Sequence, residues 1–297
     1  MRALMSLALI TLAIVTIPAY AADDCKYRGD LDTSYCDEDK DLVADPPKNP
    51  SLFRNPETIV FSFTPTENPD LLEKMFARFT KYLGQCIDKK VEYLKTYSYT
   101  EEIEAMREGK LHVGAFATGQ AAFAVNVAGA VPFGVKGDSK RFHGYNLLFI
   151  VRKDSPYRKL TALKGKTVAH VTSSSNSGHL APMALFPTLG LTPGKDYKIE
   201  FSGKHDESVF GVLSGKYDGA PVASDVFYRM AAQGRIKEED FRILYISPAF
   251  PTDVLSYVYD LEPTLRDRVV KMYVRLSFRT GVEKSPRRRG SLLSSFL

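Results

Sequence analysis

Two stretches of this 297-residue chain resemble one another and decide the fold. Gly109-Lys110-Leu111-His112-Val113-Gly114-Ala115-Phe116-Ala117-Thr118 is matched without a gap by Gly215-Lys216-Tyr217-Asp218-Gly219-Ala220-Pro221-Val222-Ala223-Ser224, at an offset of 106. Each stretch runs from a Gly-Lys turn into a short apolar segment that ends at a hydroxyl residue. Short apolar segments bounded by turn residues predict buried strands.

The similarity extends upstream of these stretches. At the same offset, the helix expected around Ile103 and Met106 matches one around Val209 and Val212. At an offset of 108, residues 60–66 match residues 168–174, and each is an apolar run followed by a hydroxyl-rich loop. Strands that alternate with helices predict an α/β protein with mostly parallel sheets, and the repeat predicts two lobes. The alternative is a chance similarity between two ordinary strand–helix units.

Other elements follow from apolar periodicity and from capping residues. Asn68-Pro69-Asp70 is a helix start, and an apolar face follows it. We expect strands over 59–63, 91–97 and 113–116, and helices over 100–108, 180–186, 226–232 and 265–276.

The N-terminus predicts export. Arg2 precedes an apolar run over 3–17, which has signal-peptide length and is too short for a comfortable membrane span. Ala19-Tyr20-Ala21 then fits a cleavage site. We therefore expect a signal peptide over 1–21 and a soluble, exported mature chain without a lipid anchor, and the family resemblance described below implies the periplasm. A retained membrane anchor is the alternative.

The mature chain divides by composition and by the repeat. Residues 22–56 are polar and read as an N-terminal extension. We expect residues 57–147 together with 250–297 to form lobe 1, and residues 148–249 to form lobe 2. The tail over 284–297 is basic and of low complexity, which indicates a truncation or a frame change.

The three cysteines predict one disulfide. Cys25 and Cys36 lie in a short polar segment, and in an oxidising compartment we expect them to pair. A metal site is the alternative, but no histidine is near in sequence. We also expect no metal at His170 and His179, which are too far apart for a helical metal pair.

Charge and motifs narrow the class of ligand. The formal net charge is +5, with both signs interspersed except at Arg287-Arg288-Arg289, which gives weak support to an anionic ligand and none to nucleic acid. The chain has no Gly-x-x-x-x-Gly-Lys-Ser/Thr nucleotide loop, and nothing in it requires a cofactor.

The binding loops are expected at the carboxyl ends of the parallel strands, where open α/β sheets bind ligands. In the second copy, Ser173-Ser174-Ser175-Asn176-Ser177-Gly178 offers hydroxyl and amide donors at a helix N-terminus, which favours an anion. Such runs also serve as helix caps or flexible loops. The first copy places Thr64-Pro65-Thr66 opposite this loop, and the repeat pairs Tyr99 with His205 and Thr118 with Ser224.

Several motifs between about Ile59 and Tyr257 occur together in one known family. The chain resembles the periplasmic phosphate/phosphite/phosphonate-binding proteins of ABC transporters. The motifs are Tyr99 before Ile103-Glu104-Ala105-Met106-Arg107, Gly144-Tyr145 before Ile150-Val151-Arg152-Lys153-Asp154-Ser155, Leu163-Lys164-Gly165-Lys166 before Ser175-Asn176-Ser177-Gly178, His205, and Ser247-Pro248-Ala249-Phe250-Pro251-Thr252-Asp253.

The resemblance implies a type II two-lobed binding protein with its ligand cleft between the lobes. It also implies that Ser175, Asn176 and Ser177 grip the oxyanion, although Asn176 replaces the usual Thr. Ring residues and acidic residues would line the rest of the cleft, and Asp225 stands where the phosphonate binders more often have Glu. These are Tyr99, Tyr145, His205, Asp225 and Asp253, and we add Thr64 and Thr118 from the repeat.

The two aspartates predict selectivity. A carboxylate repels an oxyanion unless the ligand carries a P–OH or an ammonium group, so a fully ionised sulfate would be rejected. The alternative role of Asp225 is to cap the helix that follows it.

The expected function is that of a monomeric solute-binding subunit. It would close by a hinge on a small phosphorus oxyanion and pass it to the permease and ATPase of an importer. We place the hinge crossings near Leu147–Val151 and Leu244–Ser247. The same fold could instead bind a thiamine precursor or an organosulfonate, or could serve a periplasmic sensor. A hydrolase that used Ser175, His205 and Asp225 would lack the Gly-x-Ser-x-Gly elbow, so we do not expect an enzyme.

Overall fold

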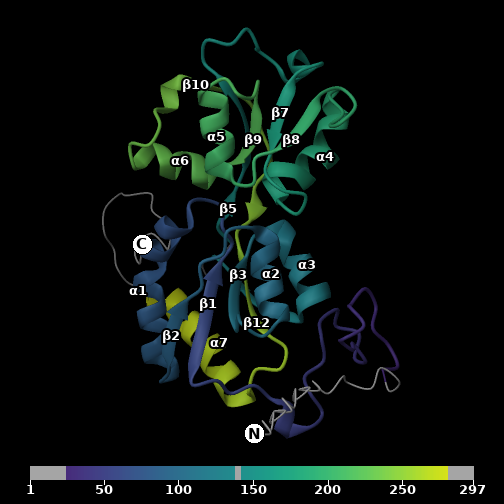
Figure 1. Ribbon diagram of the computed structural model, residues 1–297, viewed down its shortest axis with the longest axis vertical. Helices are drawn as coiled ribbons and strands as arrows, with labels where there is room; N and C mark the ends of the chain where they lie inside the picture. The colour runs from purple at the N-terminus through teal and green to yellow at the C-terminus, as the bar shows by residue number, and fades with distance from the viewer. Residues whose placement is uncertain (1–24, 138–141, 280–297) are drawn as a thin grey trace, which may run out of the picture.

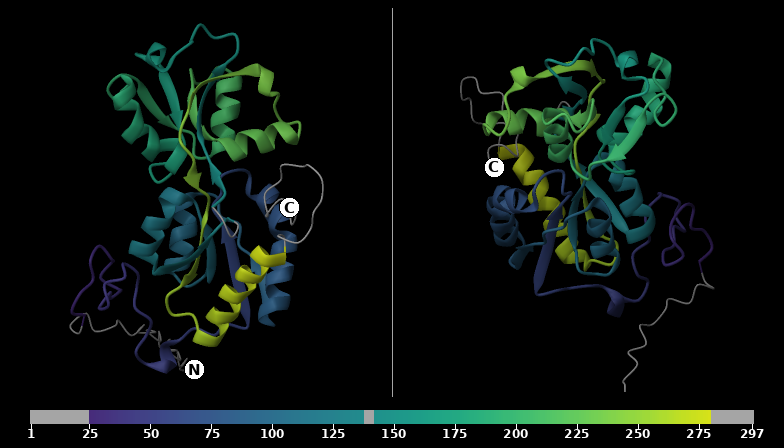
Figure 2. Two further views of the ribbon diagram at one scale, coloured as in Figure 1. Left: turned by 180° about the vertical axis from the view of Figure 1, so that it is seen from behind. Right: turned by 45° about the horizontal axis from the view of Figure 1, so that its top comes forward.

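Two α/β lobes lie one above the other and meet at a narrow waist (Figure 1). The computed structural model describes residues 25–137 and 142–279. Each lobe is built on five strands with helices packed around them, and Figure 2 shows the same division from two further sides. The two-lobed α/β architecture expected from the repeat is therefore confirmed.

The sheet of lobe 1 has one antiparallel strand among five. β12 runs antiparallel to both of its neighbours, β3 and β4, whereas β1 is parallel to β2 and to β3. The strand order is β2 (Lys90–Tyr93), β1 (Thr58–Phe63), β3 (Val113–Phe116), β12 (Val254–Val258) and β4 (Ala130–Val135), and the helices are α1 (Pro69–Ile87), α2 (Tyr99–Arg107), α3 (Thr118–Ala128) and α7 (Pro263–Arg279).

Lobe 2 repeats this order. β6 is antiparallel to β9 and β10, β7 is parallel to β8, and a bridge between Val168 and Gly219 joins β7 to β9. The strands are β8 (Lys198–Phe201), β7 (Thr167–His170), β9 (Ala220–Ala223), β6 (Leu147–Arg152) and β10 (Phe241–Ile246). The helices are η3 (Leu160–Leu163), η4 (Asn176–Leu180), α4 (Ala181–Leu185), η5 (Phe186–Leu189), α5 (His205–Leu213), α6 (Ser224–Ala232) and η6 (Glu238–Asp240).

The repeated positions do equivalent work in the two lobes. The Val60 N–H of β1 donates to His112 Nδ1 at 2.9 Å, and the Thr167 N–H of β7 donates to Asp218 Oδ2 at 2.9 Å. His112 and Asp218 are partners in the repeat. Both accept a backbone N–H near the start of a strand, which fastens the loop before β3 to β1 and the loop before β9 to β7.

The helix expected over 180–186 differs in one respect. It begins with a π-helical turn at Asn176, and the N–H groups of both His179 and Leu180 donate to Ser175 O at 3.0 Å. A π turn inserts an extra residue into the helical repeat and often lies at a functional site. The apolar periodicity of the sequence does not reveal this insertion, because the π turn precedes the apolar face of the helix.

The N-terminal segment is attached to lobe 1. Cys25 and Cys36 form the expected disulfide, with their Cα atoms 5.6 Å apart. Leu31 and Tyr35 are buried in a small cluster that packs against Tyr259. A short 3-10 helix, η2 (Pro50–Leu52), follows, and the Arg54–Asp260 ion pair holds the end of the segment.

Two sequence expectations fall outside the described residues. These are the signal peptide over 1–21 and the basic tail over 284–297. Within the described ranges, no helix combines the length and the apolar character that a membrane span needs.

The chain crosses between the lobes beside two short strands at the waist. β5 (Gly144–Tyr145) pairs with β11 (Phe250–Pro251), and Asn146 Nδ2 donates to Ser247 O at 2.8 Å. The expected crossings near 147–151 and 244–247 lie mostly inside lobe 2 instead, because β6 and β10 are strands of its sheet. Apolar runs of this kind occur both in buried strands and in connecting segments, which is why the sequence placed the crossings too far into lobe 2.

Candidate functional site

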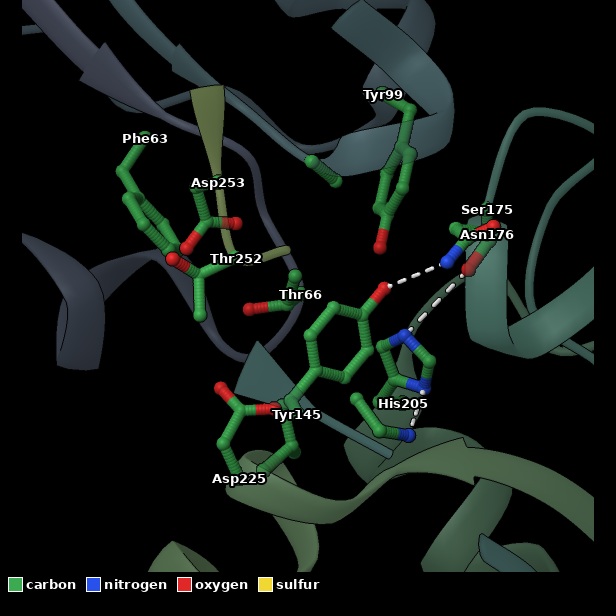
Figure 3. A pocket seen from close by; sticks show the side chains of 13 residues that line it. Phe63, Thr66, Tyr99, Tyr145, Ser175, Asn176, His205, Asp225, Thr252 and Asp253 are labelled. Carbon is green, nitrogen blue, oxygen red and sulfur yellow. Dashed lines mark hydrogen bonds between the residues drawn. The ribbon is translucent and has the colours of Figure 1, made fainter. Parts of the chain in front are cut away.

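A small cavity lies between the lobes, where the carboxyl ends of the parallel strands face one another. Its volume is about 30 Å³, which restricts an occupant to a few heavy atoms. Within the described residues, its wall contains no Lys or Arg. The lining residues are Phe63, Thr66, Tyr99, Ala117, Tyr145, Ser175, Asn176, His205, Ala223, Asp225, Val226, Thr252 and Asp253 (Figure 3).

His205 is held as a neutral hydrogen-bond donor. It is the first residue of α5, and its Nδ1 accepts the Ala223 N–H at 3.1 Å. Burial lowers the pKa of His205 to about 4, so the ring is neutral at pH 7. The proton must therefore sit on Nε2, which lies 3.5 Å from Ser175 Oγ and faces the cavity (Figure 3).

The same tautomer argues against the hydrolase. A general base for Ser175 would need a lone pair at His205 Nε2, and that atom carries the proton. The orienting group at Nδ1 is a backbone N–H and not a carboxylate. Ser175 Oγ instead accepts the Gly178 N–H at 3.3 Å, as a helix cap does.

Tyr99 is the counterpart of His205 in lobe 1. It is the first residue of α2 and is 1% exposed. Its hydroxyl has no hydrogen-bond partner and points toward the cavity (Figure 3). Burial raises the pKa of Tyr99, so the hydroxyl keeps its proton. An unpartnered buried donor costs about 1–3 kcal/mol, which a bound acceptor would recover.

Tyr145 stands between the two walls at the waist. Asn176 Nδ2 donates to its hydroxyl at 3.2 Å (Figure 3). Thr66 Oγ1 also lines the cavity from lobe 1, and it is buried without a partner. Donors from lobe 1, from lobe 2 and from the waist therefore converge on one small space.

Two carboxylates complete the wall. Burial, together with the nearby negative charge of Asp225, raises the pKa of Asp253 to about 7. Asp225 lies 3.6 Å from Arg229 Nη1, one helical turn further along α6. Near neutral pH, Asp253 can thus carry the proton that an oxyanion needs from a carboxylic acid neighbour.

Seven of the ten residues expected to bind a ligand line this cavity, and three do not. Thr64 is fully buried behind the wall, where its Oγ1 accepts the Ala117 N–H at 2.8 Å and contacts Glu102. Thr118 Oγ1 donates to Pro251 O at 2.8 Å. Ser177 Oγ is buried without a hydrogen-bond partner, and Ser177 is not among the residues that line the cavity.

Several contributors were missing from the expectation. Thr66 and Thr252 stand within two of the quoted motifs but were not named as binding residues, so their position in those motifs was the available signal. Phe63 and Val226 gave none, because they read as ordinary core residues. The missed lining residues are Phe63, Thr66, Ala117, Ala223, Val226 and Thr252.

Two other clusters of chemistry-bearing groups lie away from the cavity. His170 Nδ1 and His179 Nδ1 are 2.8 Å apart. His170 Nε2 also forms a hydrogen bond with the Tyr197 hydroxyl at 2.8 Å. The fold therefore brings the two histidines into contact, although they are nine residues apart in the sequence. In the N-terminal segment, Asp37, Asp39 and Asp41 place carboxylate oxygens within 4.8 Å of one another.

Glu102 supports the lobe 1 wall from behind. It is fully buried, Thr64 Oγ1 lies 2.8 Å from its Oε2, and Gln120 Nε2 donates to the same oxygen at 3.0 Å. Burial raises the pKa of Glu102 to about 8, so it is largely protonated at neutral pH. Gln120 Nε2 also donates to Tyr99 O at 2.8 Å, which connects this network to the cavity.

We predict that Glu102→Gln stabilises the protein at alkaline pH. A carboxyl whose folded pKa is raised loses stability as pH rises from its unfolded pKa of 4.5 to about 8, and the amide removes that loss. The free energy of unfolding of the variant, relative to wild type, should rise by roughly 2–4 kcal/mol between pH 5 and pH 9. Urea unfolding at the two pH values measures this difference, and a pH-independent difference would contradict the prediction.

Similarities in sequence and in fold identify the family of this chain. A family model described as "ABC transporter, phosphonate, periplasmic substrate-binding protein" matches residues 61–287. The probable ABC transporter phosphite binding protein PhnD1 of Prochlorococcus marinus (strain MIT 9301) is 24% identical over 210 residues, which cover 67% of this chain and 69% of the relative.

Two further similarities agree with this family. The phosphonates-binding periplasmic protein of Escherichia coli (strain K12) is 22% identical over 72% of this chain, and the match spans 64% of that relative's length. The crystal structure of Prochlorococcus marinus PhnD1 in complex with methylphosphonate has a TM-score of 0.67 at 20% identity, covering 75% of this chain and 85% of that one. Because the family model spans most of the chain, the protein belongs to the phosphonate-type periplasmic substrate-binding proteins of ABC transporters.

Proposed function

We propose that the mature chain is exported through a cleaved signal peptide and acts as a monomeric solute-binding subunit. It closes on a small phosphonate- or phosphite-like oxyanion and delivers it to the permease and ATPase of an importer. One observation supports this most: Tyr99 from lobe 1 and His205 from lobe 2 present buried neutral donors to the same cavity. Neutral donors bind an oxyanion without the tight hold of a fully buried cation, so the ligand can be released.

The donor set also suggests which ligands are rejected. With Asp225 and Asp253 in the wall, a fully ionised anion can accept a proton from Asp253 but has none to donate to the carboxylate of Asp225. A ligand that carries a P–OH can donate to one of them. Asp253, with its raised pKa, can also donate to the ligand. Methylphosphonate and phosphite should therefore bind, and sulfate should not.

The test is isothermal titration of the mature chain with phosphite, methylphosphonate, 2-aminoethylphosphonate, phosphate and sulfate. Tyr99→Phe should weaken binding of the preferred ligand by about 10- to 100-fold, because it removes one hydrogen bond to a charged group. Its melting temperature should not fall, since the hydroxyl has no partner to lose. Tyr157→Phe, which removes a hydroxyl bonded to Asp218 outside the cavity, is the matched control. Tight binding of sulfate, or an unaffected Tyr99→Phe variant, would refute the proposal.

A further inference from the structure

An ion-pair cluster joins the two lobes beside the cavity. Glu67 follows β1 in lobe 1 and is fully buried. Its Oε2 accepts from Arg229 Nε of α6 at 2.6 Å, and its Oε1 accepts from Arg235 Nη1 at 3.0 Å. Arg235 Nη2 also donates to Asp206 Oδ2 of α5 at 3.0 Å. The cluster holds two charges of each sign and is neutral as a whole.

Backbone groups on the same loop strengthen this junction. The His205 N–H of lobe 2 donates to Thr66 O of lobe 1 at 3.1 Å, and the Asn68 N–H donates to Asp206 Oδ2 at 3.2 Å. Thr66 and His205 both line the cavity. Separation of the lobes would therefore break these backbone bonds and the ion pairs in the same motion.

The cluster is also coupled to the charge of the cavity. Arg229 donates to Glu67 through Nε, and its Nη1 lies 3.6 Å from Asp225 in the cavity wall. Burial raises the pKa of Glu67, and the facing guanidinium groups oppose that shift. A buried carboxylate is tolerated only while its partners face it. When the lobes part, water replaces those partners.

We propose that Glu67, Arg229, Arg235 and Asp206 form an interlobe latch, in which Glu67 is a positioning residue that holds the closed state and fixes Arg229 beside Asp225. The latch sets how long the ligand remains enclosed. This inference rests on the proposed function, because it assigns the latch to the closure of the same oxyanion cavity.

The test is stopped-flow dissociation of methylphosphonate from wild type and from Glu67→Gln, which keeps the shape of the side chain but removes its charge. We expect dissociation to become about 10- to 100-fold faster and association to change by less than about threefold, because the latch forms after encounter. Asp260→Asn is the matched control. It breaks an ion pair of 2.9 Å that is confined to lobe 1, so it should lower the melting temperature without changing dissociation.

Two further measurements separate the latch from general destabilisation and from the ligand proposal. Glu67→Gln combined with Arg235→Gln should dissociate no more than about threefold faster than the faster single variant, because both remove the same contact. Fully additive effects, or dissociation unchanged in Glu67→Gln, would overturn the latch. If wild type does not bind methylphosphonate, the proposed function fails by itself. X-ray scattering of the unliganded proteins then decides the latch, which predicts a larger radius of gyration for Glu67→Gln and is overturned by equal radii.

Discussion

Gly119→Ala is expected to weaken oxyanion binding by about 10- to 100-fold without loosening the fold. Gly119 is the second residue of α3 in lobe 1, and it packs directly on the loop of residues 173–178 in lobe 2. A Cβ atom there would lie 2.5 Å from Ser174 O, 2.9 Å from Asn176 N and 2.8 Å from a methyl of Leu180. Two of these are backbone atoms, so the lobes could not close to their present separation.

Gly119→Ala should impair the closure of the two lobes without destabilising lobe 1. Alanine favours a helix over glycine by about 1 kcal/mol, so lobe 1 should be as stable as in wild type or more so. An overpacked contact costs about 1–3 kcal/mol, and here only the closed state bears it. Isothermal titration and thermal unfolding measure the two effects separately.

Ala122→Gly, at an exposed position of the same helix, is the control: it should lower stability and leave affinity unchanged. A Gly119→Ala protein that binds as tightly as wild type would show that the lobes do not close to this contact.

Asp253 should make binding depend strongly on pH. Its pKa is about 7 without ligand, and a bound oxyanion raises it further, so above pH 7 binding requires uptake of a proton. The affinity of wild type should fall by up to about tenfold per pH unit, or about 100-fold between pH 7 and pH 9. Asp253→Asn cannot ionise and should lack this fall.

The ratio of the two dissociation constants isolates the effect of Asp253. Titration of the ligand itself affects both proteins equally, so the wild-type constant divided by the Asp253→Asn constant should rise with pH. A ratio that does not change with pH would show that Asp253 does not contribute to ligand binding. The sign also separates two classes of ligand, because an ammonium group beside Asp253 stabilises the ionised carboxylate. For 2-aminoethylphosphonate bound in that way, the ratio should fall with pH instead.

The repeat was sufficient to predict the two lobes because the matched residues carry out the same structural task twice. Tyr99 and His205 begin equivalent helices, and His112 and Asp218 each accept a backbone N–H near the start of a strand. Local patterns of this kind are encoded within about ten residues and can be read without a structure. They locate strand ends, and hence the region where a ligand binds.

The sequence was less informative wherever the answer depends on which way a side chain turns. Thr64 and Thr66 are two residues apart in one loop, yet Thr66 lines the cavity while Thr64 bonds to the buried Glu102. Ser177 was expected to bind beside Ser175, but it is not among the residues that line the cavity. The ion pairs of Glu67 could not be predicted, because its partners Arg229 and Arg235 lie more than 160 residues away in the sequence.

A crystal structure of the mature chain with methylphosphonate tests the central claim most directly. The account predicts electron density for the phosphonate between the lobes. Its oxygens should lie within hydrogen-bonding distance of Tyr99 Oη from lobe 1 and of His205 Nε2 and Ser175 Oγ from lobe 2, with Asp253 beside one of them. A ligand held by one lobe only, or bound outside this cavity, would contradict the account.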